Sequence, residues 1–174
     1  QIQPNHVDSH NNLGTVFQQL GKHQKAITCY QKAIQIQPNY AAAHYNLGKL
    51  FKSSGEYKKT ISYYQKAIQI NPNYAEAHNN LGLVFFELGK FQKAISCYQK
   101  AINSKYNFAL AHNNILFALL YLEVDPKFYL SRAKEFRSSL KPIKDDLLLK
   151  YQYNTKPKKL RIGFVSGDFK NHPV

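Results

Sequence analysis

The sequence predicts an all-α solenoid of stacked helix pairs, followed by the start of an α/β domain. The first observation is a 34-residue pattern that occurs three times, in residues 7–40, 41–74 and 75–108. The second is that both halves of each copy place apolar residues at helical spacing. The third is an apolar, β-prone run that begins at residue 160. Because neither helix of a copy can bury its apolar face alone, the copies are expected to stack on one another.

Each copy is predicted to hold two helices. In the first copy, Leu13 and Phe17 share one helical face, and Gly21 follows as a C-terminal stop. Tyr30 lies on the apolar stripe of the second helix, which Pro38 ends because proline cannot continue a helix. Closely matching residues recur one and two repeats later, so the same helix pair is expected three times.

A second glycine lies inside the first helix of every copy, at Gly14, Gly48 and Gly82. Glycine in a helix interior costs about 1 kcal/mol relative to alanine. We therefore expect these positions to require the absence of a side chain, so that the two helices of a pair can cross closely.

The pattern His-x-x-Leu-Gly-x-x-Phe, then Ala-x-x-x-Tyr, then Pro, resembles the tetratricopeptide repeat (TPR). His10 and its equivalents stand where that repeat usually has Trp, and Thr60 stands where the second copy should have Ala. The resemblance implies a right-handed solenoid whose concave side is lined by the first helix of each copy.

The pattern decays after the third copy, where Leu116 replaces the helical glycine. The helix expected here is apolar nearly all round, which predicts burial on several sides. Asp125 and Pro126 are expected to begin a further amphipathic helix. The predicted regions are the repeat array 1–122, with the end of another repeat in 1–6 and a degenerate repeat in 109–122, a helical connector and linker 123–159, and the start of the α/β domain 160–174.

The chain is strongly basic, with 24 Lys and Arg against 10 Asp and Glu and a formal charge of +14. This balance suggests an acidic or phosphate-bearing partner. Many lysines recur at one repeat position, as on a solvated helix face, and no groove-reading motif is present, so nucleic-acid binding is not expected. The longest apolar run, residues 115–122, is too short to span a membrane.

Cys29 and Cys97 occupy the same position in the first and third copies. Helix layers pack about 10 Å apart, so the two residues should lie about 20 Å apart, too far for a disulfide. We predict two small buried packing residues in a reducing compartment, and hence a cytoplasmic location.

Four histidines also recur one repeat apart, at His10, His44, His78 and His112. Equivalent positions of adjacent copies lie about 10 Å apart, whereas zinc ligands lie about 2 Å from a shared centre. We therefore predict packing residues and no metal site.

Asn12, Asn46, Asn80 and Asn114 hold the sixth position of every copy, including the degenerate one. Asparagine is a poor residue in mid-helix. One interpretation is that each amide donates to and accepts from the backbone of an extended peptide on the concave side, without reading its sequence. The other is that asparagine is ordinary in this repeat and ties neighbouring helices together. The sequence leaves both open.

Residues 159–174 read Lys-Leu-Arg-Ile-Gly-Phe-Val-Ser-Gly-Asp-Phe-Lys-Asn-His-Pro-Val. After tandem TPRs, this string resembles the opening of the catalytic region in the O-linked N-acetylglucosaminyltransferase and SPINDLY family, with Phe164 where Tyr is usual. The resemblance implies two Rossmann-like lobes that transfer a sugar from a nucleotide donor to Ser or Thr of a protein, without a metal or other cofactor. UDP-GlcNAc is the expected donor, and GDP-fucose is the alternative.

By the same resemblance, His172 is the family's active-site histidine, and the asparagines hold substrate proteins. An imidazole can accept or relay a hydroxyl proton near neutral pH. The alternative for His172 is that, with Pro173, it only caps a helix start. The expected function is substrate recruitment for such an enzyme, with this segment alone inactive. The rival from another class is a non-enzymatic TPR adaptor that assembles partner proteins.

Overall fold

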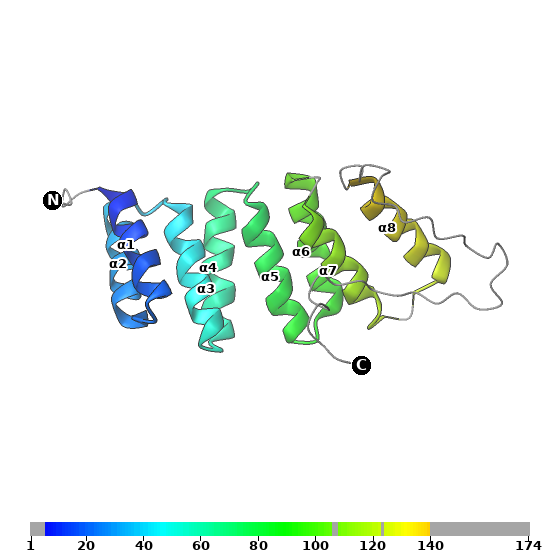
Figure 1. Cartoon of the computed structure of the whole chain (residues 1–174), viewed down its shortest axis with the longest axis horizontal. Helices are drawn as coiled ribbons and strands as arrows, with labels where there is room; N and C mark the ends of the chain where they lie inside the picture. The colour runs from blue at the N-terminus through cyan, green and yellow to red at the C-terminus, as the bar shows by residue number, and fades with distance from the viewer. Residues whose placement is uncertain (1–5, 106–107, 123, 140–174) are drawn as a thin grey trace, which may run out of the picture. The chain divides into compact units, whose positions relative to one another are not determined.

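The computed structural model describes residues 6–105, 108–122 and 124–139, and within them every regular element is an α-helix (Figure 1). The helices have the lengths and order that the repeat pattern predicts for stacked pairs. The predicted strand at residue 160 and His172 lie outside the described residues. The helices are α1 (Val7–Gln19), α2 (His23–Ile36), α3 (Ala41–Ser53), α4 (Tyr57–Ile70), α5 (Ala75–Glu87), α6 (Phe91–Ser104), α7 (Ala109–Leu119) and α8 (Pro126–Ser139).

The helices form hairpins, α1 with α2, α3 with α4 and α5 with α6, and the hairpins follow one another in a single line (Figure 1). Successive hairpins also touch through their first helices, α1 with α3 and α5 with α7. Equivalent elements of a curved stack come closest on its inner side, so the odd-numbered helices line that side. We call the surface formed by the exposed side chains of α1, α3, α5 and α7 the inner face. The predicted solenoid is confirmed.

The glycine that follows each first helix ends it as predicted. Gly21, Gly55 and Gly89 have φ angles of 69°, 73° and 69°, in the left-handed region that side chains disfavour. The next backbone N–H then turns back to the helix, and Lys22 N donates to Phe17 O at 2.8 Å. This is the hydrogen bond that closes a glycine-capped helix end.

The glycine inside each first helix faces a tyrosine of the second helix. A Cβ atom added at Gly14, Gly48 or Gly82 would lie 2.6, 2.6 or 2.5 Å from a ring atom of that tyrosine. The three rings, Tyr30, Tyr64 and Tyr98, are at most 1% exposed. The predicted close crossing is therefore confirmed, and a tyrosine ring fills the space that the missing side chain leaves.

The recurring histidines join each repeat to the one before it. His44 Nε2 lies 3.0 Å from the carbonyl oxygen of Pro38, and His78 Nε2 lies 2.9 Å from that of Pro72. Both prolines end the preceding copy, and both histidines are buried. The prediction of packing residues is confirmed, with the added role of a hydrogen bond to the connecting turn.

Helix α7 differs in one respect from what its composition predicts. Its buried side chains include His112, Ile115 and Leu119, but Leu110 and Phe117 are 52% and 49% exposed. The prediction of burial on several sides is confirmed, since α7 contacts α5, α6 and α8, but the side of α7 that belongs to the inner face stays exposed because no described helix covers it.

Helix α8 packs on α7 in the same compact unit and reaches α6 through one side-chain hydrogen bond. Phe136 stacks on His112 with ring centroids 5.7 Å apart, and Arg132 donates to Gln99 of α6. As predicted, Asp125 caps the helix, since its carboxylate accepts from Lys127 N at 3.0 Å.

Cys29 and Cys97 are buried, unpaired thiols, as predicted, and burial raises the pKa of both. Among the helices of the described part, none is long and apolar enough to cross a membrane.

Candidate functional site

The predicted asparagine row lies on the inner face, with one residue on each odd-numbered helix. Asn12 on α1 is exposed, while Asn46, Asn80 and Asn114 are half-buried. Such exposure is compatible with contact to a ligand on this face. The structure therefore brings the four sequence-predicted residues onto one surface, each one repeat from the next.

Each asparagine after the first donates a side-chain hydrogen bond to the preceding repeat, and we call these hydrogen bonds the ties. Asn46 Nδ2 donates to Asn11 Oδ1 and Asn114 Nδ2 donates to Asn79 Oδ1, both at 2.9 Å. Asn80 Nδ2 donates to the hydroxyl of Tyr45 at 3.0 Å. The acceptor is always the fifth residue of the preceding copy. These bonds show that the asparagines do tie neighbouring helices together, as one of the two interpretations predicted.

The ties form a continuous polar chain across three helices. Asn114 donates to Asn79, whose own amide donates to Asn80 Oδ1 at 3.4 Å, and Asn80 donates to Tyr45. Within the described part of the chain, the Oδ1 atoms of Asn46 and Asn114 accept no hydrogen bond. Each of these two amides also keeps one N–H hydrogen beyond the one it donates. Two oriented amides thus retain both donor and acceptor capacity.

The sequence did not predict the partners Asn11, Tyr45 and Asn79. A signal was present, because the fifth position of each copy carries a side chain that can accept a hydrogen bond. The sequence could not show that the sixth residue of one copy reaches the fifth residue of the copy before it, since that depends on how far each hairpin is rotated against the next.

Charged residues at the middle of the inner face are mostly paired. Lys52 Nζ lies 2.7 Å from Glu87 Oε1, and Lys105 Nζ lies 3.3 Å from Glu76 Oε1. Lys49 has no carboxylate partner among the described residues, and its ammonium lies 5.6 Å from the centroid of the Tyr45 ring. The inner face therefore presents one cation available for an acidic ligand group.

Four aromatic rings gather where α5, α6 and α7 meet. We call Phe86, Phe91, Phe117 and Tyr121 the aromatic patch. Phe91 stacks on Tyr121 at 4.9 Å between centroids, and Phe86 lies 5.2 to 5.5 Å from Phe117, Tyr121 and Phe91. Phe117 and Tyr121 remain 49% and 54% exposed. The patch is thus an apolar surface that begins with Phe86 and Phe117 on the inner face and extends to Phe91 on α6 and to Tyr121, which follows α7.

The repeat pattern did not predict the aromatic patch, although a comparison between copies carries a signal for it. The ninth residue changes along the chain from Thr15 to Lys49, Leu83 and Phe117. An inward-facing position that becomes apolar in the last copies indicates an apolar site there.

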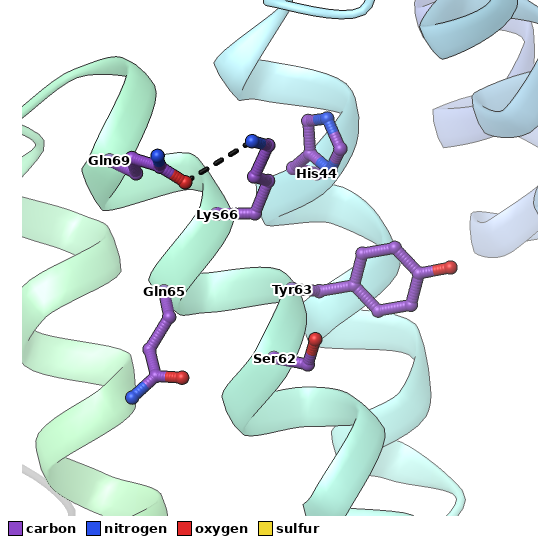
Figure 2. Close-up of a pocket in the computed structure, with 6 residues that line it drawn as sticks. All are labelled: His44, Ser62, Tyr63, Gln65, Lys66 and Gln69. Atoms are coloured by element: carbon purple, nitrogen blue, oxygen red, sulfur yellow. Dashed lines mark hydrogen bonds between the residues drawn. The ribbon is translucent and has the colours of Figure 1, made fainter.

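A pocket of about 470 Å³ lies beside α4 (Figure 2). Burial lowers the pKa of His44 in this pocket, and the nearby Lys66 charge lowers it further, against the hydrogen bond to Pro38, which raises it. Lys66 Nζ donates to Gln69 Oε1 at 3.1 Å. The lining residues are His44, Ser62, Tyr63, Gln65, Lys66 and Gln69.

The pocket recurs with the repeat, because a second one of about 360 Å³ contains His78 and Lys100 at the equivalent positions. Each pocket holds a single histidine. In the part of the chain that the structure describes, no three His, Cys, Asp or Glu side chains come close enough to hold a metal ion. We interpret these pockets as gaps that the helix stacking leaves in each repeat.

Two family models match most of the repeat array. One, described as TPR repeat, matches residues 16–55 and 48–89, and the other, described as tetratricopeptide repeat, matches residues 75–107. Together they cover more than half of the chain. No curated protein matches this sequence.

Solved structures share the fold. A crystal structure of MamA is 29% identical with a TM-score of 0.70, and the match covers 79% of this chain and 80% of that one. YrrB, described as a TPR protein with an unusual peptide-binding site, is 18% identical with a TM-score of 0.67 over 79% and 70% of the two chains.

A mutant O-GlcNAc transferase of Thermobaculum terrenum is 22% identical with a TM-score of 0.66. That match covers 76% of this chain but only 26% of the transferase. At these identities, the likeness to YrrB and to the transferase shows the fold alone. The repeat pattern, the helix stacking and the family models agree, and the chain belongs to the tetratricopeptide repeat family.

Proposed function

We propose that the inner face binds an extended segment of another protein. The observation that carries this proposal is the row of tied asparagines. A side-chain amide can donate to a backbone carbonyl and accept from a backbone N–H of a peptide, and so hold the peptide without reading its sequence. Asn46 and Asn114 keep both capacities free within the described part of the chain.

The ties between repeats support binding rather than compete with it. Each tie uses one N–H of the asparagine and fixes the orientation of its amide group. Ordering a free side chain at an interface costs about 0.5–1.5 kcal/mol. An amide that is already ordered avoids part of this cost, so the row is preorganised for a peptide backbone.

The test begins with a displayed library of random 12-residue peptides selected on the whole chain. The affinity of synthetic selected peptides is then measured by fluorescence anisotropy for the wild type and for a double variant, Asn46→Leu with Asn114→Leu. Leucine keeps the size of the side chain and removes its donor and acceptor. We expect the double variant to lose about tenfold to a hundredfold in affinity, for two or more lost hydrogen bonds.

Asn103→Leu is the matched control, because Asn103 is an exposed asparagine on α6. It should bind the selected peptides as the wild type does. Equal affinities for the wild type and the double variant would contradict the role of the asparagine row.

A second candidate function places this peptide-binding surface in a protein O-glycosyltransferase. Two observations favour it: residues 159–174 resemble the opening of that family's catalytic region, and the fold of the array is shared with the O-GlcNAc transferase of Thermobaculum terrenum. In this proposal the array recruits substrate proteins, UDP-GlcNAc is the donor, and His172 acts at the acceptor side of the sugar.

This candidate is tested on a protein that contains this chain together with a complete catalytic region. We expect it to transfer radiolabelled sugar from UDP-GlcNAc to proteins of a cell extract, and the variant His172→Ala to transfer none. If neither UDP-GlcNAc nor GDP-fucose yields labelled protein, the enzyme proposal fails and the non-enzymatic adaptor is favoured, since the same inner face serves both.

A further inference from the structure

We propose that the inner face selects peptides that carry an aromatic or leucine side chain and an acidic side chain about six residues apart. This inference rests on the proposed peptide binding and adds its specificity. The asparagine row supplies contacts that any peptide backbone can satisfy, whereas the aromatic patch and Lys49 differ from the equivalent positions of other repeats.

The aromatic patch supplies the apolar contact. Phe117 and Tyr121 expose about half of their surface, and Phe86 and Phe91 lie within ring contact of them. A ring or a leucine side chain laid on these residues would gain edge and face contacts with several rings at once. No described helix covers the patch, and it continues the same face that carries the asparagines.

Lys49 supplies the charge complementarity. The other lysine on its helix that faces the next repeat, Lys52, is bound to Glu87. Lys49 is exposed and has no carboxylate partner in the described part, and its only ring contact is with Tyr45. A glutamate or aspartate of the peptide would give this ammonium an opposite charge without displacing an existing ion pair.

The repeat geometry fixes the spacing. Lys49 and Phe117 are the ninth residues of the second and fourth copies. Equivalent positions of neighbouring hairpins lie about 10 Å apart, so the two contacts are separated by about 20 Å. An extended chain advances about 3.3 Å per residue, so about six residues span that distance. Asn80 and Asn114 lie on the helices along this path.

The probes are acetylated, fluorescein-labelled decapeptides of serine and alanine. Two of the five peptides carry Phe and Glu six residues apart, one with Phe before Glu and the other with Glu before Phe. The other three carry only Phe, only Glu, or neither. Anisotropy titrations of the whole chain should rank the Phe and Glu peptide first in one direction. We expect about tenfold weaker binding without Phe and about threefold weaker binding without Glu.

Two variants assign the contacts. Phe117→Ala should weaken the Phe and Glu peptide about tenfold, while Phe128→Ala, which removes an equally exposed ring on α8, should leave its affinity unchanged. The Lys49→Glu variant should no longer prefer the peptide that contains Glu, and should instead prefer a peptide with Lys at the position of that Glu. Lys32→Glu is the control for the change in net charge, since Lys32 is an exposed lysine on α2.

The outcomes separate this inference from the proposal beneath it. If all five peptides bind with one affinity, peptide binding stands and the specificity is wrong. If none of them binds, and the displayed library also yields nothing, the proposed peptide binding itself fails. If sedimentation shows a dimer that Phe117→Ala dissociates, a second copy of the chain covers the patch and the inference is overturned.

Discussion

The packed layer between paired helices and the inner face are built from the same first helices, yet they change differently along the chain. In the packed layer the glycine and tyrosine pair is repeated with almost one geometry, since a Cβ added at the three glycines would lie 2.6, 2.6 and 2.5 Å from the ring. On the inner face the ninth residue differs in every copy. Packing therefore dictates repetition, and the freedom to vary lies where a ligand can be recognised.

The largest effect is expected from Gly82→Leu in the packed layer. Its Cβ would lie 2.5 Å from the ring of Tyr98, which is buried and cannot move without opening the hairpin. Overpacking of this kind costs about 1–3 kcal/mol and occasionally more. Urea unfolding followed by circular dichroism should show the loss. Ser96→Leu, at an exposed position of α6, should be near neutral, and equal stability of both variants would contradict the packing account.

A smaller effect separates two buried tyrosines of the same layer. The Tyr30 hydroxyl donates to Gln18 Oε1 at 2.9 Å, whereas the buried Tyr64 hydroxyl makes no hydrogen bond of normal geometry in the described part. Tyr30→Phe should therefore cost about 1 kcal/mol, and Tyr64→Phe should be neutral or stabilising. Urea unfolding of the two variants decides the matter, and a larger loss for Tyr64→Phe would overturn the assignment of their hydrogen bonds.

The buried His44, which bonds to the preceding repeat, should make the free energy of unfolding depend on pH. Burial lowers the pKa of His44 below its ordinary value of 6.5, so the unfolded chain binds this proton more readily than the folded one. The stabilising contribution of neutral His44 is complete above pH 6.5. It is lost as the pH falls from the pKa of His44 in the unfolded chain toward its lower pKa in the folded chain. The free energy of unfolding, measured by urea at several pH values, should fall less steeply on acidification for His44→Gln. Parallel curves for the two proteins would refute the role of His44.

The smallest effect on stability is expected on the inner face. The ion pair of Lys52 with Glu87 is partly exposed, and such pairs contribute about 0–1 kcal/mol. Lys52→Ala should thus change the free energy of unfolding by less than about 1 kcal/mol. Urea unfolding of the wild type and the variant at low salt measures this change. A larger loss would mean that the inner face also holds the repeats together, and the contrast between the two regions would weaken.

The features that could be predicted from the sequence are those that repeat in every copy, and the features that could not are those that vary between copies. Residues that pack identically in each copy, such as Gly48 and Gly55, were identifiable from repetition, and the structure confirms both their places and their roles. The asparagine row was also identifiable, because it repeats. In each case one residue type recurs at one position, and a physical requirement common to all copies explains it.

The rest of the site depends on relations between copies that no single repeat contains. The tie from Asn80 to Tyr45 crosses a hairpin boundary, and the aromatic patch joins Phe91 to Tyr121 from different repeats. The exposure of Phe117 followed from the absence of a covering helix in the described part, which the composition of α7 did not reveal. His172 lies outside the described residues, and its role stays a prediction.

Peptide binding by the asparagine row is tested most sharply by a titration of the ¹⁵N-labelled chain with the Phe and Glu decapeptide, observed by two-dimensional NMR. Side-chain amide signals report on each asparagine separately. We expect the signals of Asn46, Asn80 and Asn114 to shift on binding, while that of Asn103 on α6 stays in place. Shifts confined to α2, α4 and α6, with the inner-face asparagines unchanged, would contradict peptide binding by this row.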